Sequence, residues 1–337
     1  MATHLHDWLL ETWYGDDRRG RWLRPAAWLF AGISRLRRAS YARGLLPRYR
    51  SRRPVVVVGN LTVGGTGKTP FVIWLARELA HRGLRPGIAM RGYGGAGGHA
   101  RLLTSADTAA TAGDEPVLLQ RKLPIPVAIG KRRADAARLL EDHCDVIVCD
   151  DGLQHYGLAR DIEIAVVDGS RQFGNGRMLP AGPLREPVSR LGEIDAVVVN
   201  GHGFDWPSAI RMRLEPVAVV ALRDGSRRPL TDFSGRQVTA LAAIGNPGRF
   251  FSLLREHGVL VEERVLPDHG RFTPEAAGAG ERRAILMTEK DAVKCAGDGW
   301  NDAGYVEVEA RVDAAAAAGL LARIEAMAAH RQGSHRE

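Results

Sequence analysis

Residues 55–70 read VVVVGNLTVGGTGKTP, and this stretch decides the fold. Four valines in succession after Pro54 are typical of a strand that is buried on both faces, as in a parallel sheet. A glycine-rich turn follows, and then Phe71, Leu75 and Leu79 recur at helical spacing. Strand, glycine-rich turn, Gly-Lys-Thr and helix together are the layout of a phosphate-binding P-loop.

The residue types of this loop suit a nucleoside triphosphate. Glycines let backbone N–H groups surround phosphate oxygens, and the helix N-terminus adds the positive end of its dipole. Lys68 can reach the β- and γ-phosphates, while the hydroxyl of Thr69 can bind Mg²⁺. The predicted nucleotide-binding residues are Thr62, Val63, Gly64, Gly65, Thr66, Gly67, Lys68 and Thr69.

One position departs from the strict P-loop pattern, because Thr62 stands where its first glycine belongs. The alternative interpretation is a glycine-rich turn that carries a surface lysine. The preceding strand and the Gly-Lys-Thr sequence together favour the nucleotide site.

The composition is that of a globular protein with a sizeable core, since 45% of the 337 residues are hydrophobic. This length suits two domains, or one large domain with additions. The chain has 3 cysteines, which favours a reducing cytosolic compartment over a disulfide framework or a zinc site. No apolar run reaches about 18 residues, so we expect no transmembrane helix. The N-terminus also lacks the features of a signal peptide.

The N-terminal 54 residues carry twelve arginines and four acidic residues, which accounts for the whole net charge of +8. They also hold four of the seven tryptophans. Apolar residues recur there at helical spacing, in two sets: Leu5, Trp8, Leu9 and Trp13, and then Trp22, Ala26, Leu29, Ile33 and Leu36. Tryptophan and arginine on such helices suit an anionic lipid surface better than nucleic acid. The alternative is a helical hairpin packed on the main domain.

Alternating strands and helices predict an α/β fold with a doubly wound parallel sheet. Further strands are expected at 85–90, 126–129, 145–150, 162–167 and 195–200. Composition changes near 201–207, and residues 204–310 have the pattern of a smaller α/β lobe, followed by an alanine-rich helix at 312–329. We therefore predict three parts: basic, membrane-associating amphipathic helices at 1–53, a P-loop core at 54–203, and a smaller lobe with a terminal helix at 204–337.

Several acidic residues and one histidine are candidates for chemistry. Asp150 and Asp151 end a buried strand, as metal-binding aspartates of P-loop proteins do, although an Asp-Asp-Gly turn is the alternative. Asp114 opens a helix, where an aspartate is often only an N-cap. Glu186 lies in a long loop rich in glycine and proline, which is either functional or simply solvated. His269 follows a strand of the smaller lobe, where a lone histidine is usually structural.

Taken in order, seven motifs resemble those of the tetraacyldisaccharide 4'-kinase family, the lipid A 4'-kinases of Gram-negative bacteria. They are GNLTVGGTGKTP at 59–70, RGYG at 91–94, GDEP at 113–116, DDGLQH at 150–155, LPAGPLRE at 179–186, PDH at 267–269 and TEKD at 288–291. The resemblance covers nearly the whole chain. The family carries a small hydroxyl residue at the position of Thr62, so this residue fits the family pattern.

The resemblance implies a P-loop NTPase-like kinase that uses ATP and Mg²⁺. Its γ-phosphate would go to the 4'-hydroxyl of a tetraacyl glucosamine disaccharide 1-phosphate, a lipid A precursor. The resemblance also implies peripheral attachment to the cytoplasmic face of the inner membrane, an anionic surface, through the N-terminal helices. We expect a monomer and no nucleic-acid partner.

Residue by residue, Asp114 matches the family's catalytic aspartate and His269 its partner in a dyad. Lys68 would stabilise charge on the transferring group. The acidic Mg²⁺/ATP set would be Asp150, Asp151 and Glu186, and Thr69 would add its hydroxyl. The family motif varies after the dyad histidine, where this chain has Gly270.

Two other functions are possible for a chain with this P-loop. A partner-regulated, membrane-associated ATPase of the deviant-Walker class would carry a signature lysine near the start of the loop, where this chain has Val63. A membrane-binding scaffold that holds nucleotide without chemistry leaves Asp114, His269 and the second lobe unexplained.

Overall fold

The structure is a computed structural model that describes residues 2–15, 17–92, 99–266, 273–274, 283–295 and 299–333. Within this part of the chain, 13 strands form one sheet. Its N-terminal half contains β1 (Val55–Gly59), β2 (Pro86–Met90), β3 (Arg101–Leu102), β4 (Val127–Ile129), β5 (Val146–Asp150), β6 (Ile162–Asp168) and β7 (Ala196–Asn200). Its C-terminal half contains β8 (Ile210–Ala221), β9 (Arg227–Arg228), β10 (Gln237–Ala242), β11 (Leu260–Val265), β12 (Ala284–Thr288) and β13 (Ala303–Val312).

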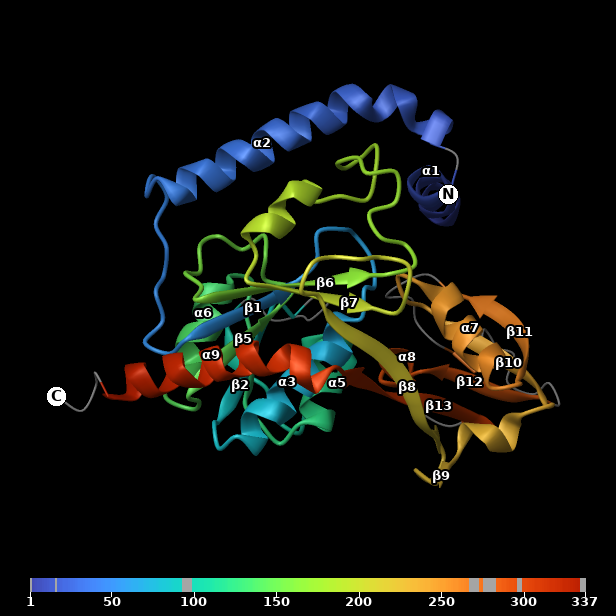
Figure 1. Cartoon of the computed structure of the whole chain (residues 1–337). Coiled ribbons are helices and arrows are strands. Elements are labelled where there is room, and N and C mark those ends of the chain that lie inside the picture. The colour runs from blue at the N-terminus through green and yellow to red at the C-terminus, as the bar shows by residue number, and fades with distance from the viewer. Residues whose placement is uncertain are drawn as a thin grey trace.

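The strands follow the order β11-β10-β12-β13-β8-β7-β6-β1-β5-β2-β4-β3, with β9 paired to β8. Every pairing from β7 to β4 is parallel, which confirms the predicted parallel sheet. Strand β8 joins the two halves, because its first residues pair with β7 and most of its length pairs antiparallel with β13. The smaller lobe therefore continues the sheet of the P-loop half (Figure 1).

The P-loop half is doubly wound, with its core on both faces of β1. Alternate valines point to opposite faces of the strand. On one face, Val56 and Val58 pack in the cluster of α3 (Lys68–His81), α4 (Ala109–Ala112) and α5 (Asp114–Lys122). On the other face, Val55 and Val57 pack with α6 (Arg133–Leu140). Phe71 of α3 is fully buried, so its truncation to alanine should cost about 3–5 kcal/mol of stability.

The terminal helix α9 (Ala314–Gly333) packs on the P-loop half, although its sequence position groups it with the smaller lobe. Its residues Ala317, Leu321 and Ile324 belong to the same core cluster as α3. Near its end, Arg331 donates to the backbone oxygen of Arg53 at 2.8 Å. The apolar side of α9 thus belongs to the core beside β1, and the division at 204–337 stays a prediction.

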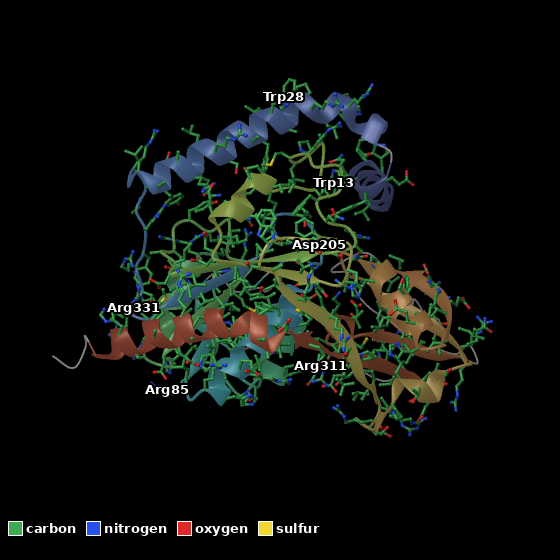
Figure 2. The ribbon with its side chains drawn as sticks, viewed as in Figure 1. Trp13, Trp28, Arg85, Asp205, Arg311 and Arg331 are labelled. Carbon is green, nitrogen blue, oxygen red and sulfur yellow. The ribbon has the colours of Figure 1, made fainter. Side chains whose placement is uncertain are left out.

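The N-terminal segment contains α1 (Ala2–Tyr14), η1 (Asp17–Leu23) and α2 (Arg24–Ala42). Trp13 of α1 is buried, and its Nε1 donates to the backbone oxygen of Pro180 at 2.9 Å. Helix α2 instead lies across the top of the molecule in Figure 1, and Trp28 points away from the body in Figure 2. In the described part of the chain, no helix has the length and apolar character needed to span a bilayer.

The remaining elements connect these parts. Between β6 and β7 lies η2 (Val188–Glu193), and η3 (Leu230–Phe233) precedes β10. Helix α7 (Pro247–Glu256) follows β10, and the short α8 (Glu289–Ala292) follows β12. Both α7 and α8 begin close after strand ends, so they bring side chains of the C-terminal half toward the P-loop.

Candidate active site

The P-loop connects the end of β1 to the start of α3 and lines a cavity of about 1490 Å³. Gly64 and Gly67 have φ angles of 113° and 91°, a left-handed conformation that glycine adopts at little cost. Because Gly67 is the N-cap of α3, the helix N-terminus opens onto the cavity, where unpaired N–H groups can bind an anion.

Seven of the eight predicted nucleotide-binding residues, those from Val63 to Thr69, line this cavity. Thr62 is buried behind them and forms a β-bridge with Leu184. The Val63 N–H donates to the oxygen of Pro183 at 2.8 Å, beside this bridge. The long loop at 175–187 thus supports the P-loop from behind.

Asn200, the last residue of β7, holds the P-loop from the other side. Its Nδ2 donates to the backbone oxygen of Thr66 at 2.9 Å, and its own backbone oxygen accepts from Arg249 Nη2 at 3.1 Å. Asn200 is fully buried, and a β-carbon at Gly67 would collide with its amide. The loop conformation is therefore coupled to α7 through one asparagine.

Asp150 is the last residue of β5, the strand next to β1, and Asp151 follows it in the turn. The two carboxylates have opposite environments. Asp150 is buried and its Oδ1 has no hydrogen-bond partner. Burial, together with the nearby charge of Glu115, raises its pKa to about 7. Asp151 lies 3.5 Å from Lys68 Nζ and 3.0 Å from Arg185 Nη2. Burial opposes its ionisation, but these two cations outweigh it and lower its pKa.

Asp114 stands at the N-terminus of α5 and lines the same cavity, together with Glu115. Its side chain is 6% exposed. Its Oδ1 accepts a hydrogen bond from the Glu115 N–H at 2.9 Å. Its Oδ2 lies 3.8 Å from Lys290 Nζ and 3.6 Å from Lys294 Nζ. The predicted base thus faces the P-loop cavity with cations of the C-terminal half beside it.

Besides Thr62, two predicted site residues are absent from the described lining of the cavity. Glu186 is buried away from the cavity, where it accepts a short hydrogen bond from the Tyr156 hydroxyl and lies 3.7 Å from Arg190 Nε. Burial raises the pKa of Glu186. His269 falls at 267–272, outside the described residues, so its pairing with Asp114 stays a prediction.

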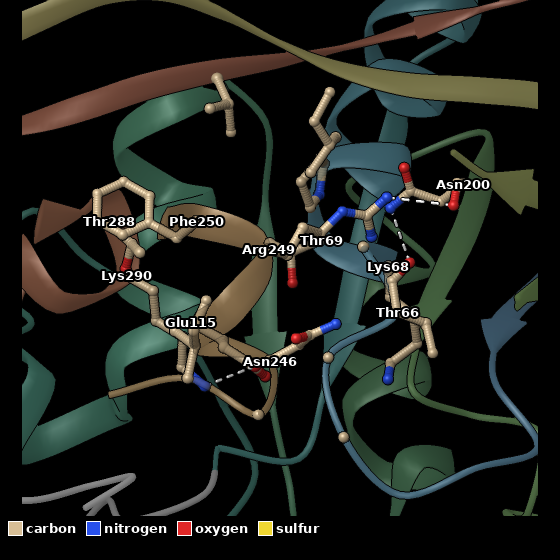
Figure 3. Close-up of a pocket in the computed structure, with 18 of the residues that line it drawn as sticks. Thr66, Lys68, Thr69, Glu115, Asn200, Asn246, Arg249, Phe250, Thr288 and Lys290 are labelled. Carbon is tan, nitrogen blue, oxygen red and sulfur yellow. Dashed lines mark hydrogen bonds and ion pairs between the residues drawn. The ribbon is translucent and has the colours of Figure 1, made fainter. Parts of the chain in front are cut away.

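The C-terminal half forms the opposite wall of the cavity, as Figure 3 shows. Asn246 Nδ2 donates to Asp168 Oδ2 at 3.0 Å, and Arg249 Nη1 lies 3.5 Å from the same oxygen. Lys290 Nζ reaches Glu115 Oε1 at 3.1 Å. These contacts bind the two halves together around the cavity. Sequence reasoning did not assign them, although Asp168 and Asn200 both carry the signal of a polar residue ending a buried strand.

The fold and this cavity define a P-loop nucleotide-binding protein, with its phosphate loop after one parallel strand and paired aspartates after the next. The sequence carries the identification further. Residues 19–325 match the family described as Tetraacyldisaccharide-1-P 4'-kinase, and the chain belongs to this family.

Relatives of this family are similar in sequence to nearly the full length of the chain. The tetraacyldisaccharide 4'-kinase of Aeromonas salmonicida is 48% identical over 335 residues, which cover 97% of this chain and 99% of the relative. That of Methylobacillus flagellatus is 44% identical over 328 residues, covering 96% and 98%. A crystal structure of LpxK from Aquifex aeolicus in complex with ATP matches with a TM-score of 0.76 and 30% identity, covering 91% of this chain and 99% of that one. These comparisons confirm the predicted family, fold and kinase class.

Proposed function

We propose that this chain transfers the γ-phosphate of ATP to the 4'-hydroxyl of a tetraacyl glucosamine disaccharide 1-phosphate at the described cavity. The observation that carries the proposal is the meeting of the P-loop, Asp114 and the Asp150–Asp151 pair in one cavity of about 1490 Å³. Sites for one small molecule typically have about 300–1,000 Å³. The larger volume suits a site that takes a nucleotide and an alcohol acceptor together.

The nucleotide phosphates would lie against the backbone N–H groups of the P-loop. Lys68 begins α3 and keeps only 15% of its side chain exposed, with Asp151 as its partner. Its ammonium is positioned to stabilise the charge that builds on the transferring phosphoryl oxygens.

Thr69, Asp150 and Asp151 would hold Mg²⁺, and their chemistry fits this cation. All three offer oxygen ligands, and the Oδ1 of Asp150 is buried without a hydrogen-bond partner. The described residues contain no group of three or more His, Cys, Asp or Glu side chains that forms a ready cage. Mg²⁺ commonly binds one or two carboxylates plus substrate phosphates, and it would supply charge neutralisation on those phosphates. Glu186 stays a prediction for this set.

Asp114 would act as the general base. As the sugar oxygen bonds to phosphorus, the bond between the γ-phosphorus and the bridging oxygen breaks, and the electron pair leaves with ADP. The hydroxyl proton passes to Asp114, whose carboxylate lines the cavity. His269 would be its partner in the predicted dyad.

We further infer that residues 1–53 attach the protein to the cytoplasmic face of the inner membrane. Trp28 and Leu36 of α2 are 74% and 69% exposed, and Leu29 and Ile33 are exposed with them. Such a face with neighbouring arginines suits an anionic lipid surface. Arg37 of the same helix lines the cavity, so lipid would be delivered beside the site.

Transfer is tested by incubating the protein with [γ-³²P]ATP and a lipid A disaccharide precursor. We expect labelled lipid, and a loss of about 10²–10⁴-fold in kcat for Asp114→Ala, because general-base catalysis contributes that much. ATP hydrolysis without labelled lipid would favour the ATPase alternative instead. Full turnover by a folded Asp114→Ala variant would refute the base assignment.

Membrane attachment is tested by flotation with vesicles that contain anionic lipid. A variant with Trp28, Ile33 and Leu36 changed to glutamine should float much less than the parent. The matched control changes the exposed apolar residues Val217, Leu260 and Val265, which lie in the C-terminal half. Equal flotation of parent and α2 variant would contradict the membrane role of this helix.

A further inference from the structure

The TEKD motif at 288–291 and the nearby Lys294 have no part in the chemistry proposed above, yet Lys290 and Lys294 reach the N-terminus of α5. Lys290 and Lys294 both place their Nζ atoms within 4 Å of Asp114 Oδ2, at 3.8 and 3.6 Å. The lysines belong to the C-terminal half and the aspartate to the P-loop half. The contact therefore crosses between the two walls of the cavity.

The two lysines are held differently. Lys290 lines the cavity, and its nearer partner is Glu115, at 3.1 Å. Lys294 is absent from the cavity lining and only 9% exposed. It lies behind Asp114 and also contacts Asp291 Oδ1, at 3.1 Å.

Asp291 is a second carboxylate partner of Lys294. It is fully buried, and its Oδ2 accepts hydrogen bonds from Thr288 Oγ1 at 2.7 Å and from the Ala243 N–H at 3.1 Å. These bonds tie the motif to the end of β10. The Lys294 ammonium therefore has little freedom to move away from Asp114.

A second contact ties α5 to the same region. Lys122, in the last turn of α5, forms ion pairs with Glu289 of α8 and with Glu307 Oε1 of β13, the latter at 2.6 Å. The helix that carries Asp114 is thus fastened to the C-terminal half at both of its ends.

We propose that Lys294 is a positioning residue for phosphoryl transfer, which holds the Asp114 carboxylate in its orientation toward the acceptor. Oδ2 meets the lysine while Oδ1 accepts the Glu115 N–H. A general base works only within a narrow geometry, and a charge held from behind supplies that geometry without occupying the cavity. This inference rests on the proposed role of Asp114 as base.

The experiment measures kcat, the KM for ATP and ATP binding for Lys294→Gln, Lys294→Arg, Asp114→Asn and the Asp114→Asn/Lys294→Gln double variant. Glutamine can still donate to Asp291 but lacks the charge. We expect its kcat to fall by about 10- to 100-fold, since a misplacement of about 1 Å can cost about 10²-fold. ATP binding should stay within about twofold, and Lys294→Arg should recover most of the kcat because it restores the charge. Lys131→Met, at an exposed lysine outside the cavity lining, is the matched control.

The double variant separates a role through Asp114 from any other. If Lys294 acts on this carboxylate, the double variant loses no more activity than Asp114→Asn alone. Independent losses that multiply would overturn the inference. So would loss of ATP binding or folding in Lys294→Gln, which indicates a scaffold role. If Lys294→Gln keeps a normal kcat while Asp114→Asn is impaired, only the inference about Lys294 is overturned. If Asp114→Asn keeps a normal kcat, the proposed role of Asp114 as base is overturned as well.

Discussion

The two walls of the cavity differ in what they contribute. The P-loop wall, from β1, α3, α5 and β5, carries Lys68, Asp114 and Asp150, groups suited to bind phosphate, metal or a proton. The C-terminal wall, from α7 and α8, carries Arg249 and Lys290. Arg249 contacts Asn200 at the end of β7, and Lys290 contacts Glu115 of α5, so both reach the P-loop half. We infer that one wall performs the chemistry and the other fixes its geometry.

This division has a cost in stability on the P-loop wall. Asp150 is a buried carboxylate with an unpartnered oxygen, and burial raises its pKa because the charged form is poorly solvated. Carboxylates with a pKa perturbed in this way cluster at functional sites. On the C-terminal wall, Arg249 instead lies 3.5 Å from the carboxylate of Asp168 and donates through Nη2 to the Asn200 oxygen. Variants of Lys68 or Asp150 on the first wall should therefore lower kcat, and loss of the Arg249 contact on the second should mainly alter ATP binding.

The largest effect is expected for Lys68→Ala. If Lys68 stabilises the transferring phosphoryl group as we propose, its removal should lower kcat/KM by at least about 10²–10³-fold, the loss typical for one such electrostatic contact. Labelled lipid formed from [γ-³²P]ATP measures it, and the exposed Lys131→Met is the control. A rise in the KM for ATP at unchanged kcat would contradict the comparison of the two walls, because Lys68 would then contribute to ATP binding and not to phosphoryl transfer.

Asp150→Asn sharpens the comparison by moving activity and stability in opposite directions. Activity should fall by about 10²-fold, as for other electrostatic contacts to the reacting group. The free energy of unfolding should rise by about 1 kcal/mol at pH 8 without nucleotide or Mg²⁺, because a buried, unpartnered charge is removed. Urea unfolding measures the second effect.

The control for Asp150→Asn is Asp142→Asn, at a carboxylate that is 77% exposed. It should change neither quantity by more than about 0.5 kcal/mol, the usual range for surface positions. A destabilised Asp150→Asn would mean that the carboxylate supports the fold, and the stability cost assigned to this wall would be absent.

Arg249→Met tests the C-terminal wall, and its expected effect on activity is smaller than those of Lys68→Ala and Asp150→Asn. It removes the donor to the Asn200 oxygen and so loosens the asparagine that holds Thr66. The KM for ATP should rise by about two- to tenfold, since one hydrogen bond contributes about 0.5–1.5 kcal/mol. Arg255→Met on the same helix, whose exposed side chain pairs with Glu263, is the control. A fall in kcat at unchanged KM for ATP would show that Arg249 contributes to phosphoryl transfer, as residues of the P-loop wall are expected to do.

The two walls also differ in how far sequence predicts them. The P-loop and Asp150 follow from local patterns, because a buried strand and the turn after it specify where the chain presents its groups. Asn200 carries the same signal, a polar residue that ends a buried strand, but its role depends on a loop 134 residues away. Lys294 meets Asp114 only through the packing of α8 on α5, and no local pattern encodes that contact.

Three other differences have similar causes. Strand β13 was not predicted, because its polar residues, such as Glu307, face partners like Lys122 that only the fold supplies. The alanine-rich α9 gives no local sign of which half it covers. Helices α1 and α2 have similar apolar stripes, yet Trp13 docks on the protein while Trp28 faces solvent. The helical spacing of apolar residues predicts that a helix has an apolar face, but it does not predict what covers that face.

The smallest expected effect concerns His155, a histidine on the P-loop wall. Burial, reinforced by the charge of Arg133, lowers its pKa to about 4. The unfolded chain therefore binds a proton near pH 6.5 that the native state refuses until about pH 4, so this residue makes stability fall as the pH drops through that window. His155→Gln should flatten the fall between pH 7.5 and 5, measured by urea unfolding, whereas the exposed His143→Gln should not. An unchanged slope in His155→Gln would show that its surroundings accept the proton, and that the arginines of this wall do not govern its charge.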